Sequence, residues 1–138
     1  MIREIAQYIS DELNWAIGPN KLLIVGHRST AAPDSCVVLL ERVGSMQDPM
    51  VPNRLDFRLQ VLSCSPSYHT ARDMAYQVYE LLFGRNRSGF ELVPVGDGPA
   101  YWVNVVVGNA PAWIGTGPRD LHQFSCNLTL RSSVRQDS

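Results

Sequence analysis

Charged side chains are scarce in this sequence. They make up 18% of the 138 residues, against about 25% in a typical soluble domain. The 12 basic and 13 acidic residues nearly cancel, which leaves a net charge of −1, whereas a nucleic-acid-binding domain would carry an excess of positive charge. Low charge with a net charge near zero is unfavourable for the solubility of a free monomer. The composition therefore disfavours a basic nucleic-acid binder and favours a protein that covers part of its surface with partners.

Long apolar runs are also missing. Even the run at residues 37–40 is far shorter than the roughly 20 residues of a membrane-spanning helix. Residues 1–18 alternate polar and apolar side chains and lack the continuous hydrophobic stretch of a signal peptide. We therefore expect neither a membrane segment nor a secretory leader.

Cysteine and histidine are few and widely spaced. Cys36, Cys64 and Cys126 are an odd number of thiols, which predicts reduced cysteines rather than a disulfide framework. No two cysteines and no two histidines have the close sequence spacing of zinc-ligand pairs. A metal site assembled from Cys64, His69 and His122 is left as a minor alternative, and we expect no metal.

Motifs for cofactors and catalysis are lacking. The glycine-rich stretches at residues 96–98 and 115–118 fit neither the dinucleotide-binding nor the P-loop pattern, so we expect turns there and no cofactor. The spot with the most chemical character is Cys64, five residues before His69 at a predicted strand-to-helix turn, because helix N-termini lower thiol pKa values. A small α+β enzyme with a Cys64–His69 centre is therefore an alternative, and the favoured hypothesis is a protein without catalytic activity.

Two segments have the apolar spacing of amphipathic helices. The first starts at Ile2 and is expected to end at Gly18-Pro19, because glycine suits a helix C-terminus and proline cannot continue the helix. The second follows Ser65-Pro66-Ser67, where a serine can cap the first turn, and is expected to end at Gly84.

Extended segments lie between and after these helices. Residues 54–63 and 122–131 alternate apolar and polar side chains, which predicts strands with one buried and one polar face. Shorter strands are expected at residues 22–25, 36–43, 90–95 and 101–107.

Two long segments, at residues 44–53 and 108–119, are predicted to be surface loops because prolines and glycines interrupt them. Loops of this length in a small domain are often functional. Their large apolar side chains either pack back on the core or meet a partner, and tryptophan is frequent in interface hot spots. These side chains are Met46, Met50, Trp113 and Ile114.

The order helix, strands, helix, strands predicts an α+β fold. We expect two helices packed on one face of a mainly antiparallel sheet of about four to five strands. The length fits a single domain, which we place at residues 1–131. Residues 132–138 are polar and are expected to form a disordered tail.

The C-terminal region resembles a known family. Residues 110–119 (Ala-Pro-Ala-Trp-Ile-Gly-Thr-Gly-Pro-Arg) and 124–130 (Phe-Ser-Cys-Asn-Leu-Thr-Leu) are similar to a loop and last strand of tail terminator proteins of long-tailed phages, also called tail-completion or minor capsid proteins. The upstream order is similar as well, with an N-terminal amphipathic helix, a strand at residues 56–61 and a helix opened by residues 71–73. The Gly-Thr-Gly-Pro-Arg part of the loop departs from the family pattern.

This resemblance implies an assembly function without catalysis. Such proteins form a ring, in general a hexamer, on the tail tube; the ring ends tube polymerisation and offers the head-joining surface. The implied partners are further copies of the chain, the tail tube protein and the head-tail connector protein, with DNA passing through the lumen without specific binding. The implied location is the neck of the virion, after assembly in the host cytoplasm. Another neck or head-completion protein of the same virion is the alternative. The residues expected at partner or subunit interfaces are Met46, Gln47, Asp48, Met50, Trp113, Ile114 and Arg119.

Overall fold

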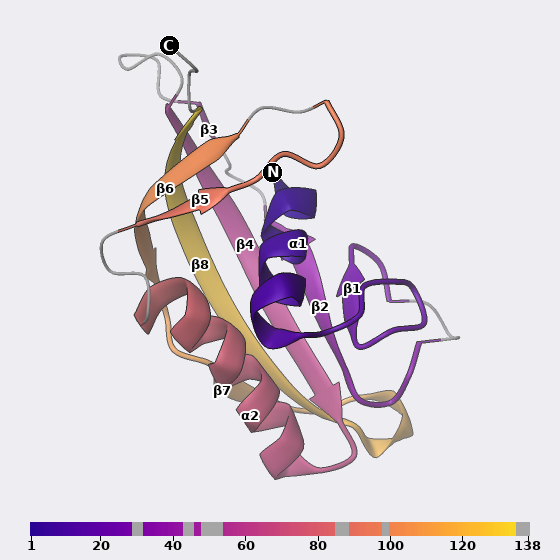
Figure 1. Cartoon of the computed structure of the whole chain (residues 1–138). Helices are drawn as coiled ribbons and strands as arrows, with labels where there is room; N and C mark the ends of the chain where they lie inside the picture. Colours follow the sequence, from indigo (N-terminus) through magenta and orange to yellow (C-terminus); the bar gives the residue numbers. More distant parts are fainter. Residues whose placement is uncertain (29–31, 43–45, 48–53, 85–88, 98–99, 135–138) are drawn as a thin grey trace.

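Two long antiparallel strands form the centre of the molecule. The computed structural model describes residues 1–28, 32–42, 46–47, 54–84, 89–97 and 100–134. Strands β4 (Arg54–Ser65) and β8 (His122–Val134) pair from Arg54 opposite Ser133 to Ser65 opposite His122. They cross Figure 1 diagonally, behind the helices.

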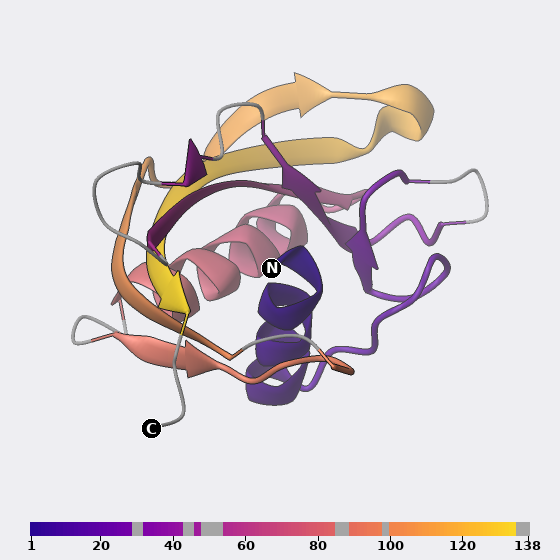
Figure 2. The same cartoon turned by 90° about the horizontal axis from the view of Figure 1, so that it is seen from above.

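Shorter strands extend this pair on both sides into a sheet of eight strands, with the order β1-β2-β4-β8-β6-β5. The short strands are β1 (Leu23–Val25), β2 (Cys36–Glu41), β3 (Met46–Gln47), β5 (Phe90–Leu92), β6 (Tyr101–Gly108) and β7 (Ala112–Thr116). Strand β3 pairs with β4 and β7 pairs with β8. Strands β1 and β2 are parallel and the other pairs are antiparallel, so the sheet is mixed. It curls into a half-barrel around the helices (Figure 2).

The helices lie on the concave side of the sheet. Helix α1 (Ile2–Leu13) ends at Asn14, whose left-handed φ of 58° is a conformation that asparagine tolerates better than most residues. It therefore ends before the expected stop at Gly18. Helix α2 (Tyr68–Tyr79) is capped by Ser67, whose side chain accepts a hydrogen bond from the Thr70 amide. A serine caps the helix as expected, but Pro66 precedes the cap instead of lying in the first turn. A π-helical turn, η1 (Glu80–Gly84), follows α2.

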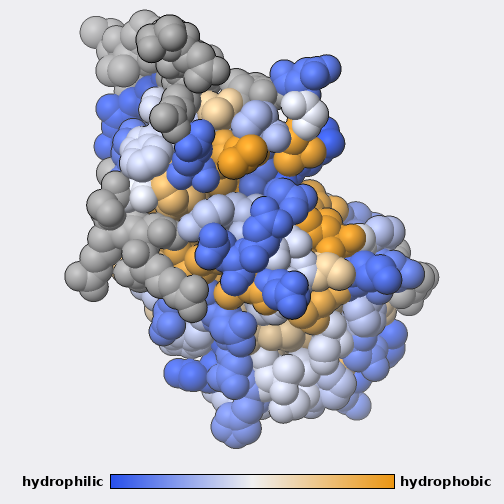
Figure 3. Space-filling view, viewed as in Figure 1, coloured by the Kyte–Doolittle hydropathy of each residue, from blue (hydrophilic) through white to orange (hydrophobic). Residues whose placement is uncertain are grey.

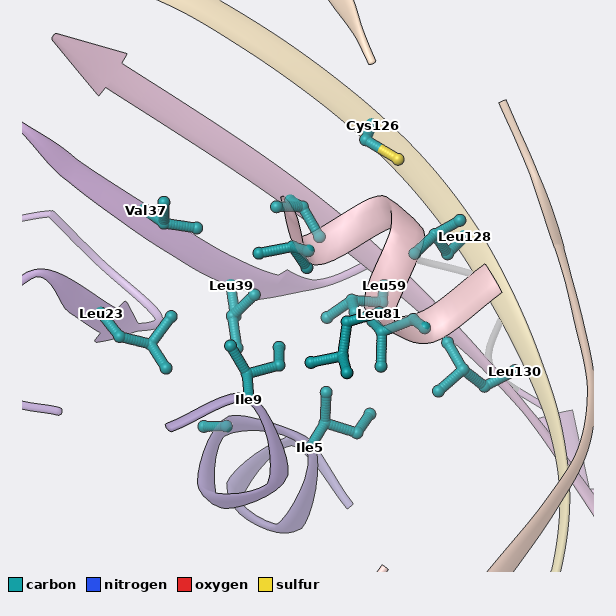
Figure 4. Packing of buried hydrophobic residues seen from close by; sticks show 14 of the residues in the cluster. Ile5, Ile9, Leu23, Val37, Leu39, Leu59, Leu81, Cys126, Leu128 and Leu130 are labelled. Atoms are coloured by element: carbon teal, nitrogen blue, oxygen red, sulfur yellow. The ribbon is translucent and has the colours of Figure 1, made fainter. Parts of the chain in front are cut away.

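The main core fills the space between the helices and the concave face (Figure 4). Alternate residues of β4 and β8 point into it, which confirms the burial pattern predicted from their alternation. The apolar face of each helix covers them. The largest fully buried side chains of this core include Ile5, Ile9, Leu23, Leu39, Leu59, Leu81, Leu82, Leu92, Leu128 and Leu130.

A smaller apolar cluster lies on the convex face. It contains Ile24, Ala32, Cys36, Val38, Cys64 and Leu121. The 3-10 turn η2 (Pro118–Asp120) directly precedes Leu121. The described residues thus cover the convex face near one end of β4 and β8.

The predicted α+β fold with four to five strands is wrong. Strands occupy 44% of the described residues and helices 28%, in an eight-stranded mixed half-barrel. The prediction failed because β3 and β7 form inside segments that look like loops, and long-range pairing rather than local pattern makes them strands. Strand β8 also runs past residue 131 to Val134, and residues 135–138 lie outside the described part.

Among the residues that the structure describes, no helix is long and apolar enough to cross a membrane.

Leu59 on β4 is fully buried in the main core. The substitution Leu59→Ala should destabilise the fold by about 2–5 kcal/mol, because it leaves a cavity under the helices. Urea unfolding followed by circular dichroism measures the loss. The matched control is Val93→Ala, at a residue that is 68% exposed, with an expected change within about 0.5 kcal/mol. Similar losses for the two variants would contradict the packing described above.

Candidate functional site

A partly exposed group of aromatic side chains lies where β7, the start of β8 and the start of α2 meet. We call Tyr68, His69, Trp113, His122 and Phe124 the aromatic patch. The Tyr68 ring is at its centre, with centroid distances of 5.1 Å to Phe124, 5.6 Å to His69, 5.7 Å to His122 and 6.5 Å to Trp113. Tyr68 is 41% exposed and Trp113 is 50% exposed, while Phe124 is buried beneath them.

The local backbone explains why this patch is open. Trp113 lies opposite Phe124, and the register then shifts between Trp113 and Gly115, which is a β-bulge at Ile114. Gly115 has a φ of 114°, a conformation that glycine adopts without strain. The bulge leaves Ile114 without a partner residue in the ladder and 55% exposed next to Trp113.

Strand β7 also forms an edge of the sheet in the described part of the chain. Among the described strands it pairs with β8 alone, and its residues, Ala-Trp-Ile-Gly-Thr, carry no charge. Edge strands usually carry charges, prolines or a cover that prevents pairing with another chain. An exposed edge that is apolar and aromatic is typical of a surface that a partner covers.

The interface residues predicted from the sequence fall in three places. Trp113 and Ile114 belong to the β7 end. Met46 and Gln47 form β3, opposite Asp56 and Leu55 of β4, at the other end of the long strands. The two places are separated by about 23 Å along β4, at about 3.3 Å per residue. Asp48 and Met50 lie outside the described residues.

Arg119 occupies the third place, in η2. Its φ of 64° is left-handed, and its guanidinium group forms an ion pair of 3.1 Å with Asp34. Both side chains are about half exposed, so the pair contributes at most about 1 kcal/mol. The structure thus places Arg119 against its own chain, apart from Trp113 and Met46.

The sequence did not single out Tyr68 as a member of a site. Tyr68 opens α2 and looked like an ordinary first residue of a helix, while His69 and His122 were considered only as catalytic or metal-ligand candidates. They become a surface only because β7 pairs with the first residues of β8 beside the start of α2. An aromatic residue directly after a serine cap was the only signal in the sequence.

The Cys64–His69 hypothesis does not match the geometry. Cys64 lies opposite Cys36 on β2, and both are fully buried. The pKa of Cys36 is lowered to about 6. The largest cause is a hydrogen bond from the Cys64 thiol; burial raises the pKa in the opposite direction, and Arg28 lowers it further. The same hydrogen bond and burial raise the pKa of the Cys64 thiol. His69 is exposed and its ring contacts Tyr68, so within the described residues Cys64 has no histidine beside it to act as a base.

The third thiol, that of Cys126, is buried as well. Burial raises the pKa of Cys126 to about 12, and its thiol donates a hydrogen bond to the Asn109 carbonyl. In the described ranges, no three histidine, cysteine or carboxylate side chains lie close enough to hold a metal ion. This includes the combination of Cys64, His69 and His122.

Comparison with known proteins adds no assignment to this geometry. No protein-family model and no curated protein matches the chain.

Thiol labelling tests the burial of the cysteines. All three are buried, so iodoacetamide at pH 7.5 should modify the native protein at least about a hundredfold more slowly than the denatured chain, since reaction requires an opening of the fold. The low pKa of Cys36 does not change this expectation, because a thiolate must also be reachable. Mass spectrometry after digestion identifies the sites. Rapid native labelling of Cys64 would contradict the burial and revive the enzyme hypothesis.

Proposed function

We propose that this chain is the subunit of a ring that caps the tail tube of a long-tailed phage, ends tube polymerisation and offers the surface that joins the head. The proposal combines the resemblance of residues 110–130 with the exposed aromatic patch at the β7 end, and the patch is the observation that carries it. The function needs neither catalysis nor a cofactor. The partners are further copies of the chain, the tail tube protein and the head-tail connector protein, in the neck of the virion.

The aromatic patch fits a protein partner. Tyrosine and tryptophan present large rigid surfaces with a polar atom at the edge, and both are enriched among the residues that dominate binding energy. Together with Ile114, they form an uncharged surface whose burial releases water from apolar groups. We assign this surface to contact with the tail tube.

A tube cap must bind different partners on its two faces, and the long strands provide two ends. The β7 end carries the aromatic patch, and the β3 end carries Met46 and Gln47. These ends lie on opposite edges of the β4–β8 pair as well as at opposite ends. In the proposed ring, the β7 end meets the tube and the β3 end meets the head connector, while DNA passes through the lumen without specific contacts.

Replacing Trp113 with alanine should weaken binding to tail tube ends by about 2 kcal/mol, or roughly 30-fold in Kd, as expected for a tryptophan hot spot. The fold should keep its stability, because this side chain is half exposed. The assay mixes the purified chain with assembling tail tube protein and measures tube lengths by electron microscopy. The wild-type chain should give short, capped tubes and Trp113→Ala long ones.

The matched control is Trp102→Ala, at a tryptophan that is 37% exposed and lies opposite Ser133, at the other end of β8. This variant should cap tubes like the wild type. Equal capping by Trp113→Ala and the wild type would contradict the assignment of the patch. Binding of the wild type to the head connector but not to the tube would favour a head-completion protein instead.

A further inference from the structure

Two thiols face each other across strands β2 and β4. Cys36 and Cys64 are directly opposed in the strand register, both side chains are 0% exposed, and the structure holds both as free thiols. A hydrogen bond joins the two side chains. They belong to the apolar cluster on the convex face, with Ile24, Val38 and Leu121. The fold therefore brings together two cysteines that lie far apart in the sequence.

The third cysteine lies on the other face of the same sheet. Cys126 is opposite Val61 of β4 and belongs to the main core, where Figure 4 shows it on β8. The helices cover this side of the sheet. Figure 3 shows the molecule from that side, where hydrophilic residues follow α1 and apolar residues lie next to them. The sheet thus separates Cys126 from the other two thiols, which makes Cys126 an internal control.

The backbone around Cys36 and Cys64 has the spacing of a disulfide. The Arg42 amide donates a hydrogen bond of 2.8 Å to the Arg58 carbonyl, and hydrogen-bonded pairs recur at every second residue of an antiparallel ladder. The register has no shift along β2 and β4, so Cys36 and Cys64 form such a pair. The Cα atoms of these pairs are about 5.5 Å apart, within the range of about 4.4–6.8 Å that disulfides span. The bond therefore needs a change of side-chain rotamer and no change of strand pairing.

The two thiols differ in acidity in the way that oxidation of a dithiol requires. The hydrogen bond from Cys64 and the charge of Arg28 hold the pKa of Cys36 at about 6, although burial acts in the opposite direction. Cys36 is therefore a thiolate at neutral pH, which is the form that attacks an oxidant. The same hydrogen bond and burial raise the pKa of Cys64, so this thiol keeps its proton until the second step of the reaction.

We propose that Cys36 and Cys64 form a reversible disulfide that fastens β2 to β4 when the chain meets a hydroperoxide. In the first step, the Cys36 thiolate attacks the outer oxygen of the hydroperoxide; the O–O bond breaks, Cys36 becomes a sulfenic acid, and the alkoxide leaves and takes a proton from solvent. In the second step, the Cys64 sulfur displaces the hydroxyl group, which leaves with the Cys64 proton as water. The two sulfurs lose two electrons, and the two oxygens of the peroxide gain them. A dithiol such as dithiothreitol reverses the change by exchange.

Peroxide reaches the buried pair through the cover on the convex face. That cover includes η2, which precedes Leu121, and the segment before β2, and an ion pair of 3.1 Å joins them through Arg119 and Asp34. Both side chains are about half exposed, so the ion pair holds the cover weakly. Local opening there admits a small oxidant without unfolding the sheet, and oxidation is therefore slower than at an exposed thiol.

A bond at this place fastens the end of the long strands that carries the aromatic patch. Cys64 lies opposite Gln123, one residue from His122. The bond also closes the loop of residues 36–64, which restricts the unfolded chain. This chemistry does not depend on the proposed function. Under that function, the subunit folds reduced in the host cytoplasm, and the bond forms once the virion is outside the cell, where disulfides persist.

Thiol counting after oxidation tests the proposal. The native chain is treated with hydrogen peroxide at pH 7.5, catalase removes the excess, and the chain is denatured and labelled with iodoacetamide without a reductant. The chain has three cysteines, so the oxidised sample should take up one label, on Cys126, and a sample reduced with dithiothreitol should take up three. Mass spectrometry of peptides cut without reduction should identify the link between Cys36 and Cys64 in monomeric chain. The Tm of the oxidised chain should rise by about 5–15 °C.

Variants of each cysteine assign the effect. Cys36→Ala and Cys64→Ala should each abolish the cross-link and the rise in Tm. The control Cys126→Ala should keep both, because Cys126 lies on the other face of the sheet. Circular dichroism checks that each variant folds, and valine replaces alanine in a variant that does not, since valine fills more of the buried space.

Three results would overturn the proposal: three labels after oxidation, a link that includes Cys126 or joins two chains, or a Tm that fails to rise in the cross-linked chain. Oxidation of Cys36 that proceeds to the sulfinic acid without a link would overturn it as well, because the Cys64 thiol would then fail to reach the sulfenic acid. Loss of the cross-link refutes this proposal and leaves the proposed function intact. Failure of the reduced wild type to bind tubes refutes the function and leaves the cross-link intact.

Discussion

The pairing of β4 with β8 is the constraint on which the rest of the molecule depends. Both strands are longer than their neighbours, so each can hold two short strands along its free edge. Strand β4 holds β2 and β3, and strand β8 holds β6 and β7. The register also decides which side chains face the helices. A slip by one residue would turn the arginines of β4 toward the core and the leucines toward solvent.

Three surfaces follow from this one pairing. The β7 end carries aromatic side chains on an uncovered edge, the β3 end lies diagonally across the sheet, and the convex face carries arginines between them.

The sequence predicted the elements whose pattern is local. Residues 54–63 and 122–131 alternate clearly enough to reveal β4 and β8, and Ser67 marks the start of α2. Strand β3 has two residues, too few for any period, and the bulge at Ile114 breaks the alternation of β7. Helix α1 ends early because the chain turns back at Asn14 and Ile17 then bridges to Leu23. These features depend on partners that are distant in the sequence.

The same distinction applies to the candidate sites. Trp113 and Ile114 were predicted from the sequence because large apolar residues are unusual between glycines and prolines. The sequence pointed to His122 only as a candidate metal ligand and did not point to Tyr68, since only the pairing of β7 brings these side chains to Trp113. The neighbourhood of Arg42, Arg58 and Arg131 could not be predicted either, because these residues approach one another only through the strand pairing.

The most direct test of the central claim is electron microscopy of tail tubes assembled in the presence of the wild-type chain. The account predicts a ring of subunits at one end of each tube, shorter tubes as the chain concentration rises, and free chain that adds no density along the tube wall. Tubes of unchanged length with no density at either end, together with a monomeric chain at every concentration, would contradict it.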